Sequence, residues 1–211
     1  MRRLPIFAFA LMFGCAPATP LLWGGATTPN GRVDVAVGSA ALATTNDTPL
    51  SIEGVAPVAT IRHGIARNLD WGVGAYGALG FADLRWEPYA DDASALRPSV
   101  GLGLRVYGGL SGDELGRLGA ELPVMFQINA TSLLELWVGG RVGLHAIVAG
   151  EGIDDAIGLH VGPTLGLAGG FRNLHALVEV SVLYFTWNGS PATAEASGAQ
   201  IVPAASLRYR F

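Results

Sequence analysis

The sequence predicts an all-β fold, namely a closed antiparallel transmembrane β-barrel of about 8–10 strands. Half of the 211 residues are hydrophobic and only 14% are charged, which is too apolar for an ordinary soluble domain. No uninterrupted apolar run reaches the roughly 18 residues that a membrane-spanning helix needs. Because every backbone polar group must be paired inside lipid, a closed barrel is the other way for such a chain to cross a membrane. An apolar/polar alternation with a period of two along most of the chain supports this architecture.

The predicted strands follow one another with short breaks between them. In the clearest example, Val100, Leu102 and Leu104 alternate with small or charged residues. Single-chain bacterial barrels have even strand numbers, so one segment is miscounted. The doubtful zone runs from Asp83 to Gly119 and contains either a bulge or a loop, because Asp83, Arg85 and Trp86 interrupt the alternation. The nine periodic segments are 32–42, 55–61, 71–81, 99–107, 117–128, 134–148, 157–171, 176–186 and 205–211.

The last segment carries the most specific signal. Leu207, Tyr209 and Phe211 share one face of an extended strand, while Ser206, Arg208 and Arg210 share the other. This strand resembles the closing strand of bacterial outer-membrane β-barrels, and residues 32–211 resemble their small OmpA/OmpX-like class. The resemblance implies an outer-membrane location, lipid around the barrel, and recognition of Leu207, Tyr209 and Phe211 by the barrel-insertion machinery.

Two further patterns favour a membrane barrel over a soluble one. The apolar faces carry almost no charge over spans of about 9–11 residues, as lipid-facing strands require. A soluble lipocalin-like barrel would place its apolar residues inside and its polar residues outside. Aromatic residues gather at strand ends, as in interfacial girdles; they are Trp71, Phe171, Tyr184, Trp187, Tyr209 and Phe211.

The amino terminus reads as a targeting segment over residues 1–18, with Arg2 and Arg3 before a short apolar stretch. Cys15 is the only cysteine. Gly14-Cys15 resembles a bacterial lipoprotein junction, which implies lipidation of Cys15. The alternative is an ordinary signal cleaved near Ala16–Ala18, and the sequence leaves both open. Residues 19–31 are expected to form a periplasmic lead-in, and residues 32–211 to form the barrel.

Several charged residues are predicted to face the lumen, where they must pair because an unpaired buried charge is costly. The favoured interpretation is a structural network, and the alternative is a narrow pore. One hairpin register follows from the outward apolar residues alone: it pairs Ile128 with Leu134 and Glu121 with Arg141, with Arg105 as a third member. A missing rung or bulge is expected beside Pro123, which lacks an amide donor. Inward glycines leave room for water or for large neighbours such as Trp137 and Tyr107. The predicted inward charges are Asp34, Arg62, Arg105, Glu121, Glu135, Arg141, Glu179, Arg208 and Arg210.

Little in the sequence indicates chemistry. His145 and His160 are expected to oppose one another near the outer mouth, below Asp154 and Asp155, which is a weak indication of a metal site; no metal or other cofactor is expected. No motif ties a serine to a histidine, so a lipid- or peptide-modifying enzyme is a minority alternative. The net charge of −4 gives no basic footprint for nucleic acid. The favoured role is structural or surface interaction, with an unknown ligand, through loops around Tyr89–Leu96, Leu110–Gly116, Gly150–Asp155 and Asn188–Ser197.

Overall fold

The computed structural model describes residues 19–24, 26–45, 51–111, 115–131, 133–148, 156–188 and 197–211. These residues form ten strands and no helix. The strand number lies at the upper end of the expected range. The strands are β1 (Val33–Thr45), β2 (Ser51–Ala66), β3 (Leu69–Tyr76), β4 (Leu79–Ala90), β5 (Pro98–Ser111), β6 (Leu115–Thr131), β7 (Leu134–Val148), β8 (Ala156–Phe171), β9 (Leu174–Asn188) and β10 (Ser197–Arg210).

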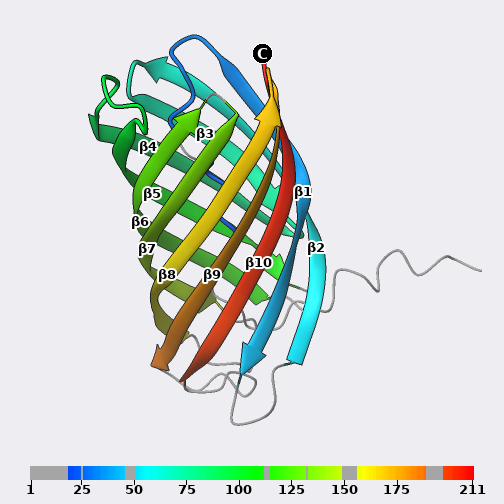
Figure 1. Ribbon diagram of the computed structural model, residues 1–211. Coiled ribbons are helices and arrows are strands. Elements are labelled where there is room, and N and C mark those ends of the chain that lie inside the picture. Colours follow the sequence, from blue (N-terminus) through cyan, green and yellow to red (C-terminus); the bar gives the residue numbers. More distant parts are fainter. Residues whose placement is uncertain are drawn as a thin grey trace, which may run out of the picture.

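The ten strands close into one antiparallel barrel (Figure 1). Each strand pairs with its neighbours in the chain, and β1 pairs with β10 to complete the ring. We call the end that carries the connections 67–68, 91–97, 132–133 and 172–173 and the carboxy terminus the turn end; it lies at the top of Figure 1. The opposite end is the loop end. In bacterial barrels the short turns face the periplasm and the loops face outward.

The alternating residues of the sequence face the lumen and the outer wall of the barrel in turn. In β7, Glu135 and Trp137 are buried in the lumen, whereas Leu136 and Val138 are exposed on the outer wall. Successive side chains of a strand point to opposite faces, so one strand serves both surfaces. The expected fold class, a closed antiparallel barrel, is confirmed.

The miscounted segment is explained by a tight turn that the sequence analysis overlooked. Residues 71–81 span two strands, β3 and β4, joined at Gly77-Ala78. Gly77 has a φ of 57°, a left-handed conformation that glycine adopts without steric cost. The interpretation of Asp83 and Arg85 as breaks was wrong, because both are buried on the inward face of β4. The added turn reverses the direction of the two strands that follow β4, which are β5 and β6.

One expected surface loop lies at the wrong end for contact with the outside. The connection after β4, residues 91–97, is at the turn end, opposite the loop end that holds the other three expected loops. The error follows directly from the missed turn at Gly77-Ala78. Tyr89, expected in this loop, lies in β4.

The register of the β6–β7 hairpin differs from the expected one by two residues. Ile128 pairs with Leu136 and Glu121 with Gly143, because β6 continues to Thr131 and a bulge lies between Ile128 and Thr131. A shift of two keeps every side chain on its face, so the inside and outside assignments survive. The gap expected beside Pro123 does not occur within this hairpin, where Pro123 pairs with Arg141, but on its other side the β5–β6 ladder lacks the Gly103/Pro123 and Leu104/Leu122 rungs while its register continues.

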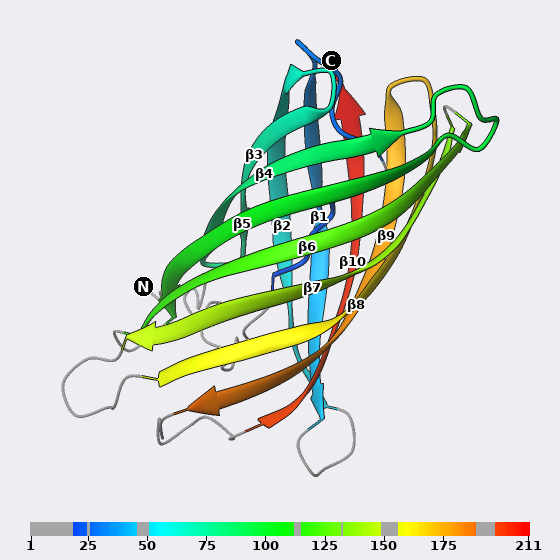
Figure 2. The same ribbon diagram turned by 90° about the vertical axis from the view of Figure 1, so that its left-hand side faces the viewer.

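The chain before β1 runs inside the barrel. Gly31 donates its amide to the carbonyl of Gly64 at 2.8 Å, and Arg32 donates to Pro29 at 2.9 Å, which turns the chain back into the lumen at the turn end. Figure 2 shows this blue stretch within the ring of strands. Thr19, Leu21 and Trp23 are at most 1% exposed. Residues 19–24 and 26–28, expected as part of a periplasmic lead-in, therefore lie within the barrel, and we call them the lumenal segment.

Candidate functional site: a lumen filled by the amino-terminal segment

A ladder of alternating charges crosses six strands of the lumen. Arg62 bridges Asp70 at 2.8 Å and Asp83 at 2.7 Å, and Arg85 also pairs with Asp70. Arg105 joins Asp83 at 2.8 Å, which links this group to the next. Each of these five charges has an opposite charge beside it, which offsets the cost of removing it from water.

The ladder continues through the three residues that the sequence analysis singled out. Glu121 lies 3.3 Å from the guanidinium of Arg141 and 3.7 Å from that of Arg105. The structure brings these side chains together although Glu121 and Arg141 are not directly opposed in the register. Residues diagonal across a strand pair remain within reach of long side chains, which explains the contact.

A second group of charges lies nearer the turn end. Arg208 donates to Glu135 at 2.7 Å, and the Nδ1 atom of His175 lies 3.5 Å from the same carboxylate. Arg210 makes two hydrogen bonds to Asp34, both 2.7 Å long. All nine inward charges predicted from the sequence lie on the lumen face.

Three arginines of the barrel wall hold backbone carbonyls of the lumenal segment. Arg105 donates to Pro20 at 2.6 Å and to Leu21 at 2.8 Å. Arg85 donates to the carbonyls of Trp23 at 2.7 Å and Ala26 at 2.8 Å, and Arg141 donates to that of Thr19. These bonds satisfy carbonyls that have no strand partner inside the lumen.

Carboxylates hold the donors of the same segment. Glu179 accepts the amides of Leu21 at 2.9 Å and Leu22 at 3.0 Å with its two oxygens. Asp83 accepts the indole N–H of Trp23 at 3.2 Å, and Asp70 accepts the amide of Thr28. Side chains of the wall thus provide hydrogen-bond partners for the lumenal segment, which belongs to no sheet. We also call this segment the strap.

Glycines of the wall make room for this strap. A Cβ atom at Gly103 would overlap the indole of Trp23, and one at Gly64 would overlap the carbonyls of Thr28 and Pro29. Other inward glycines accommodate large neighbours, as expected: a Cβ at Gly119 would overlap Tyr107, and one at Gly166 would overlap Trp137.

His145 and His160 lie close together, but the expectation that they are directly opposed was wrong, because His145 pairs with Gly158 and His160 with Gly143. Their Nδ1 atoms are 3.3 Å apart, and Nε2 of His160 is 3.3 Å from Glu121. Trp187 packs edge-on against His145 with ring centroids 4.1 Å apart, so Trp187 faces the lumen and was wrongly expected in an interfacial girdle. No cluster of three or more His, Cys, Asp or Glu suited to a metal ion occurs in the described part of the chain. Asp154 and Asp155 lie outside the described residues.

The three residues of the expected insertion signal lie on the outer wall. Leu207, Tyr209 and Phe211 are exposed, and the rings of the last two contact each other with centroids 4.8 Å apart. Phe211 donates its amide to the carbonyl of Val33 at 2.8 Å, which ties the carboxy terminus to β1. Cys15, the expected lipidation site, lies outside the described residues.

Neither the lumenal segment nor its partners Asp70, Asp83 and Arg85 were predicted from the sequence. A signal for the strap was present, because Leu21, Leu22 and Trp23 form an apolar run that a segment exposed to water has no reason to carry. The alternation of Asp83, Arg85 and Glu87 with Leu84 and Trp86 also continues the period of two.

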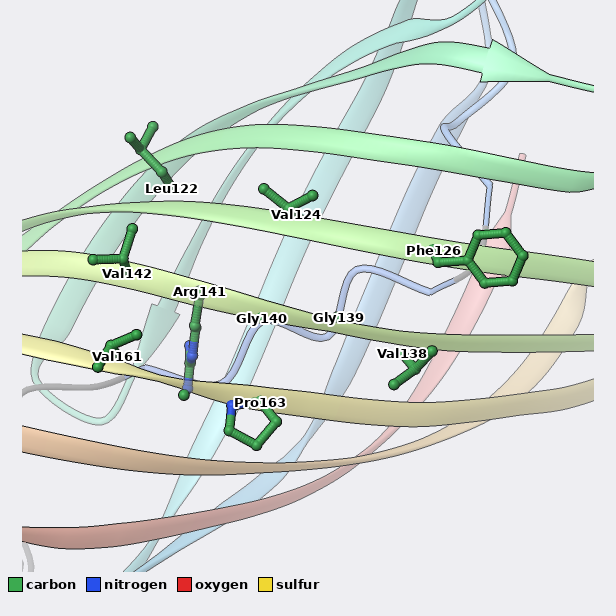
Figure 3. A pocket seen from close by; sticks show the side chains of 11 residues that line it. Leu122, Val124, Phe126, Val138, Gly139, Gly140, Arg141, Val142, Val161 and Pro163 are labelled. Carbon is green, nitrogen blue, oxygen red and sulfur yellow. The ribbon is translucent and has the colours of Figure 1, made fainter.

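The outer wall exposes large apolar side chains on every strand, with Val37 alone on β1 and several Val, Leu and Ile residues on strands such as β7. Figure 3 shows a depression in this wall where Gly140 carries no side chain between Val138 and Val142. Aromatic residues at strand ends face outward, as expected for Trp71, Phe171, Tyr184, Tyr209 and Phe211. None of the described residues forms a helix long and apolar enough to cross a membrane.

An apolar exterior, a charged interior and an even number of antiparallel strands define a transmembrane β-barrel of the outer-membrane type, located in the bacterial outer membrane. No protein-family model matches the chain, and no curated protein matches it.

Solved structures similar to the chain are small outer-membrane proteins. The attachment invasion locus protein Ail of Yersinia pestis has a TM-score of 0.40 at 11% identity, covering 86% of this chain and 99% of Ail. Neisserial surface protein A has a TM-score of 0.38 at 13% identity, covering 86% and 100%. OprG from Pseudomonas aeruginosa has a TM-score of 0.33 at 12% identity, covering 88% and 98%. At these values the likeness concerns strand arrangement alone.

Proposed function

We propose that the protein is a self-plugged barrel that does not conduct, and that its role is structural or lies in surface contacts made at the loop end. The observation that carries the proposal is the lumenal segment, whose backbone carbonyls are held by Arg85, Arg105 and Arg141. A barrel of this size has a narrow interior, which side chains and one strap suffice to fill. The passive pore is the less favoured role for this reason.

The histidine contacts support a non-catalytic role. His145 and His160 face each other, Glu121 and Trp187, and His175 faces Arg208 and Glu135. A serine nucleophile would need a histidine within hydrogen-bond reach, and the contacts of these three histidines go to one another, Glu121, Glu135 and Arg208. The hydrogen-bonded histidines act as part of the lumen packing.

Conductance in planar bilayers tests the plug. We expect the purified full-length barrel to show no steady channel, and a variant that lacks residues 19–26 behind its signal to conduct. Gly103→Val should act in the same direction, because the new side chain overlaps the indole of Trp23. Gly80→Val is the matched control, since a Cβ at Gly80 meets no atom closer than 3.8 Å. Equal conductance of the wild type and the deletion variant would refute the plug.

The carboxy-terminal strand is proposed as the signal for the barrel-insertion machinery. The rings of Tyr209 and Phe211 lie outside the lumen, so they are free of the packing that holds the strap. Removal of Phe211 should leave the protein degraded or stranded in the periplasm, as followed by heat-modifiability gels of membrane fractions. Normal amounts of folded protein in the outer membrane after this deletion would contradict the proposal.

A further inference from the structure

The first described residue, Thr19, is held in the middle of the lumen and not at either mouth. It is fully buried, its carbonyl accepts a hydrogen bond from Arg141, and its hydroxyl accepts one from Arg105 at 3.2 Å. Arg141 stands seven positions from each end of β7, Leu134 and Val148. With a rise of about 3.3 Å per residue and a strand tilt of about 40°, each rim is roughly 18 Å away along the barrel axis.

The same two arginine nitrogens that hold Thr19 also face Glu121. Nη1 of Arg141 is 3.3 Å from Oε2 of Glu121, and Nη1 of Arg105 is 3.7 Å from Oε1. The two oxygens of Thr19 and the carboxylate of Glu121 therefore share two donor groups, Nη1 of Arg105 and Nη1 of Arg141. Oε1 of Glu121 is fully buried and accepts no hydrogen bond from the described residues. A buried carboxylate oxygen without a donor is costly, so the site suits one more donor.

The sequence supplies that donor if the chain is cut immediately before Thr19. Ala16-Pro17-Ala18 precedes it, with small residues at the first and third positions before the bond, as signal cleavage sites have. We propose that the chain is cleaved between Ala18 and Thr19, and that the new α-ammonium group of Thr19 stays inside the barrel, paired with Glu121.

This processing and lipidation of Cys15 exclude one another. Cys15 is four residues before Thr19, and four extended residues span at most roughly 14 Å. Cleavage after Ala18 removes Cys15, and an uncleaved Cys15 could not itself reach either rim while Thr19 keeps its contacts with Arg105 and Arg141. The lumenal position of Thr19 thus favours the ordinary signal over the lipoprotein signal. The inference concerns processing and holds whether or not the lumen conducts.

The composition makes the test direct. All 13 basic residues are arginine and the chain contains no lysine, so the α-amino group is the only primary amine of the processed protein. Intact mass and amino-terminal sequencing of barrels from outer membranes should give a chain that begins Thr19-Pro20-Leu21. An acylated Cys15, or any other starting residue, would overturn the proposal.

Amine labelling tests the pairing with Glu121. An N-hydroxysuccinimide ester should label the heat-denatured protein once per chain and the folded protein at least tenfold more slowly. Glu121→Gln should raise the labelling rate of the folded protein, whereas Glu135→Gln, which removes a buried carboxylate that pairs with Arg208, should not. If the folded wild type is labelled as fast as the denatured one, the terminus is not buried. If the denatured protein takes no label, the terminus is blocked, and either result refutes the proposal. The wild-type comparison stands even if Glu121→Gln fails to fold.

Discussion

The two halves of the lumen are filled by different means. Towards the turn end, buried charges of the wall hold the lumenal segment through its backbone. Towards the loop end, apolar side chains pack against one another, as Leu42, Leu183 and Val202 do on three adjacent strands. On β9 the change occurs within one strand, from His175 and Glu179 to Leu183, Phe185 and Trp187.

The lumen can be filled by a backbone segment or by side chains, and the two need different numbers of hydrogen-bond partners. A peptide inside a lumen brings carbonyls and amides that need partners, so the wall around it must be charged or polar. Side chains such as Phe185 and Trp187 bring little polar surface, so they pack without such partners. The arginine ladder thus supplies the partners that the strap needs. Substitutions in the turn-end half should therefore affect both stability and conductance, and substitutions in the loop-end half should affect stability alone.

The largest effect is expected for Arg105→Ala. Arg105 is fully buried and makes five hydrogen bonds, which go to Asp83, Thr19, Pro20 and Leu21. Its removal leaves Asp83 and Glu121 with one fewer positive charge and frees the strap, which should cost about 5 kcal/mol, the upper end for breaking a buried pair. Urea titration read by heat-modifiability gels measures the loss, and bilayer recordings should show new conductance. A variant that is as stable as the wild type and does not conduct would show that the strap does not need Arg105 to stay in place.

The Glu121–Arg141 pair should show a smaller effect that is partly recoverable. Glu121→Ala should cost about 3–5 kcal/mol because it leaves Arg141 buried without its carboxylate, and the double variant with Arg141→Ala should recover part of this loss. A double-mutant cycle in urea measures the coupling. Strict additivity of the two single changes would mean that the 3.3 Å contact contributes nothing to stability.

In the loop half, Leu183→Ala should affect stability alone. Leu183 is fully buried among Leu42 and Val202, so the change opens an apolar cavity and should cost about 3 kcal/mol, as buried leucines do. Conductance should stay at the wild-type level because no contact of the strap is touched. An open channel in this variant would show that the apolar half, and not the strap, closes the lumen.

Features that depend on neighbouring residues were predicted from the sequence better than features that depend on residues far apart in the chain. The alternation of Val100, Leu102 and Leu104 is local, and it predicts the barrel, the faces and the inward charges correctly. The turn at Gly77-Ala78 was missed although it shifts the alternation by one residue: Trp71 and Val73 face outward on β3, whereas Phe81 on β4 faces the lumen. The register of β6 and β7 was wrong by two because a bulge near Thr131 leaves the face of each residue unchanged.

The strap was beyond sequence reasoning for a different reason. Its contacts join residues far apart in the chain, such as Leu21 and Glu179, and no periodicity reports them. The buried Glu179 was predicted to face inward, but its partners are backbone amides, which every segment offers equally. Only the apolar residues Leu21, Leu22 and Trp23 in an expected linker indicated that this stretch is buried.

The smallest effect is expected outside the lumen, and it sets the scale for the others. Arg67 pairs with Asp92 at 2.7 Å at the turn end, but the two side chains are 89% and 65% exposed. Water and salt screen such a pair, and holding two long side chains in place costs entropy, so Arg67→Ala should change stability by less than about 1 kcal/mol. The pair has the same 2.7 Å length as Arg62–Asp83, so geometry is matched and burial is the variable that differs. The urea midpoints of Arg67→Ala and the wild type should coincide at high salt. A loss of stability as large as that of Arg105→Ala would mean that burial does not explain the contribution of the lumen charges to stability. The distinction between buried and exposed ion pairs would then fail.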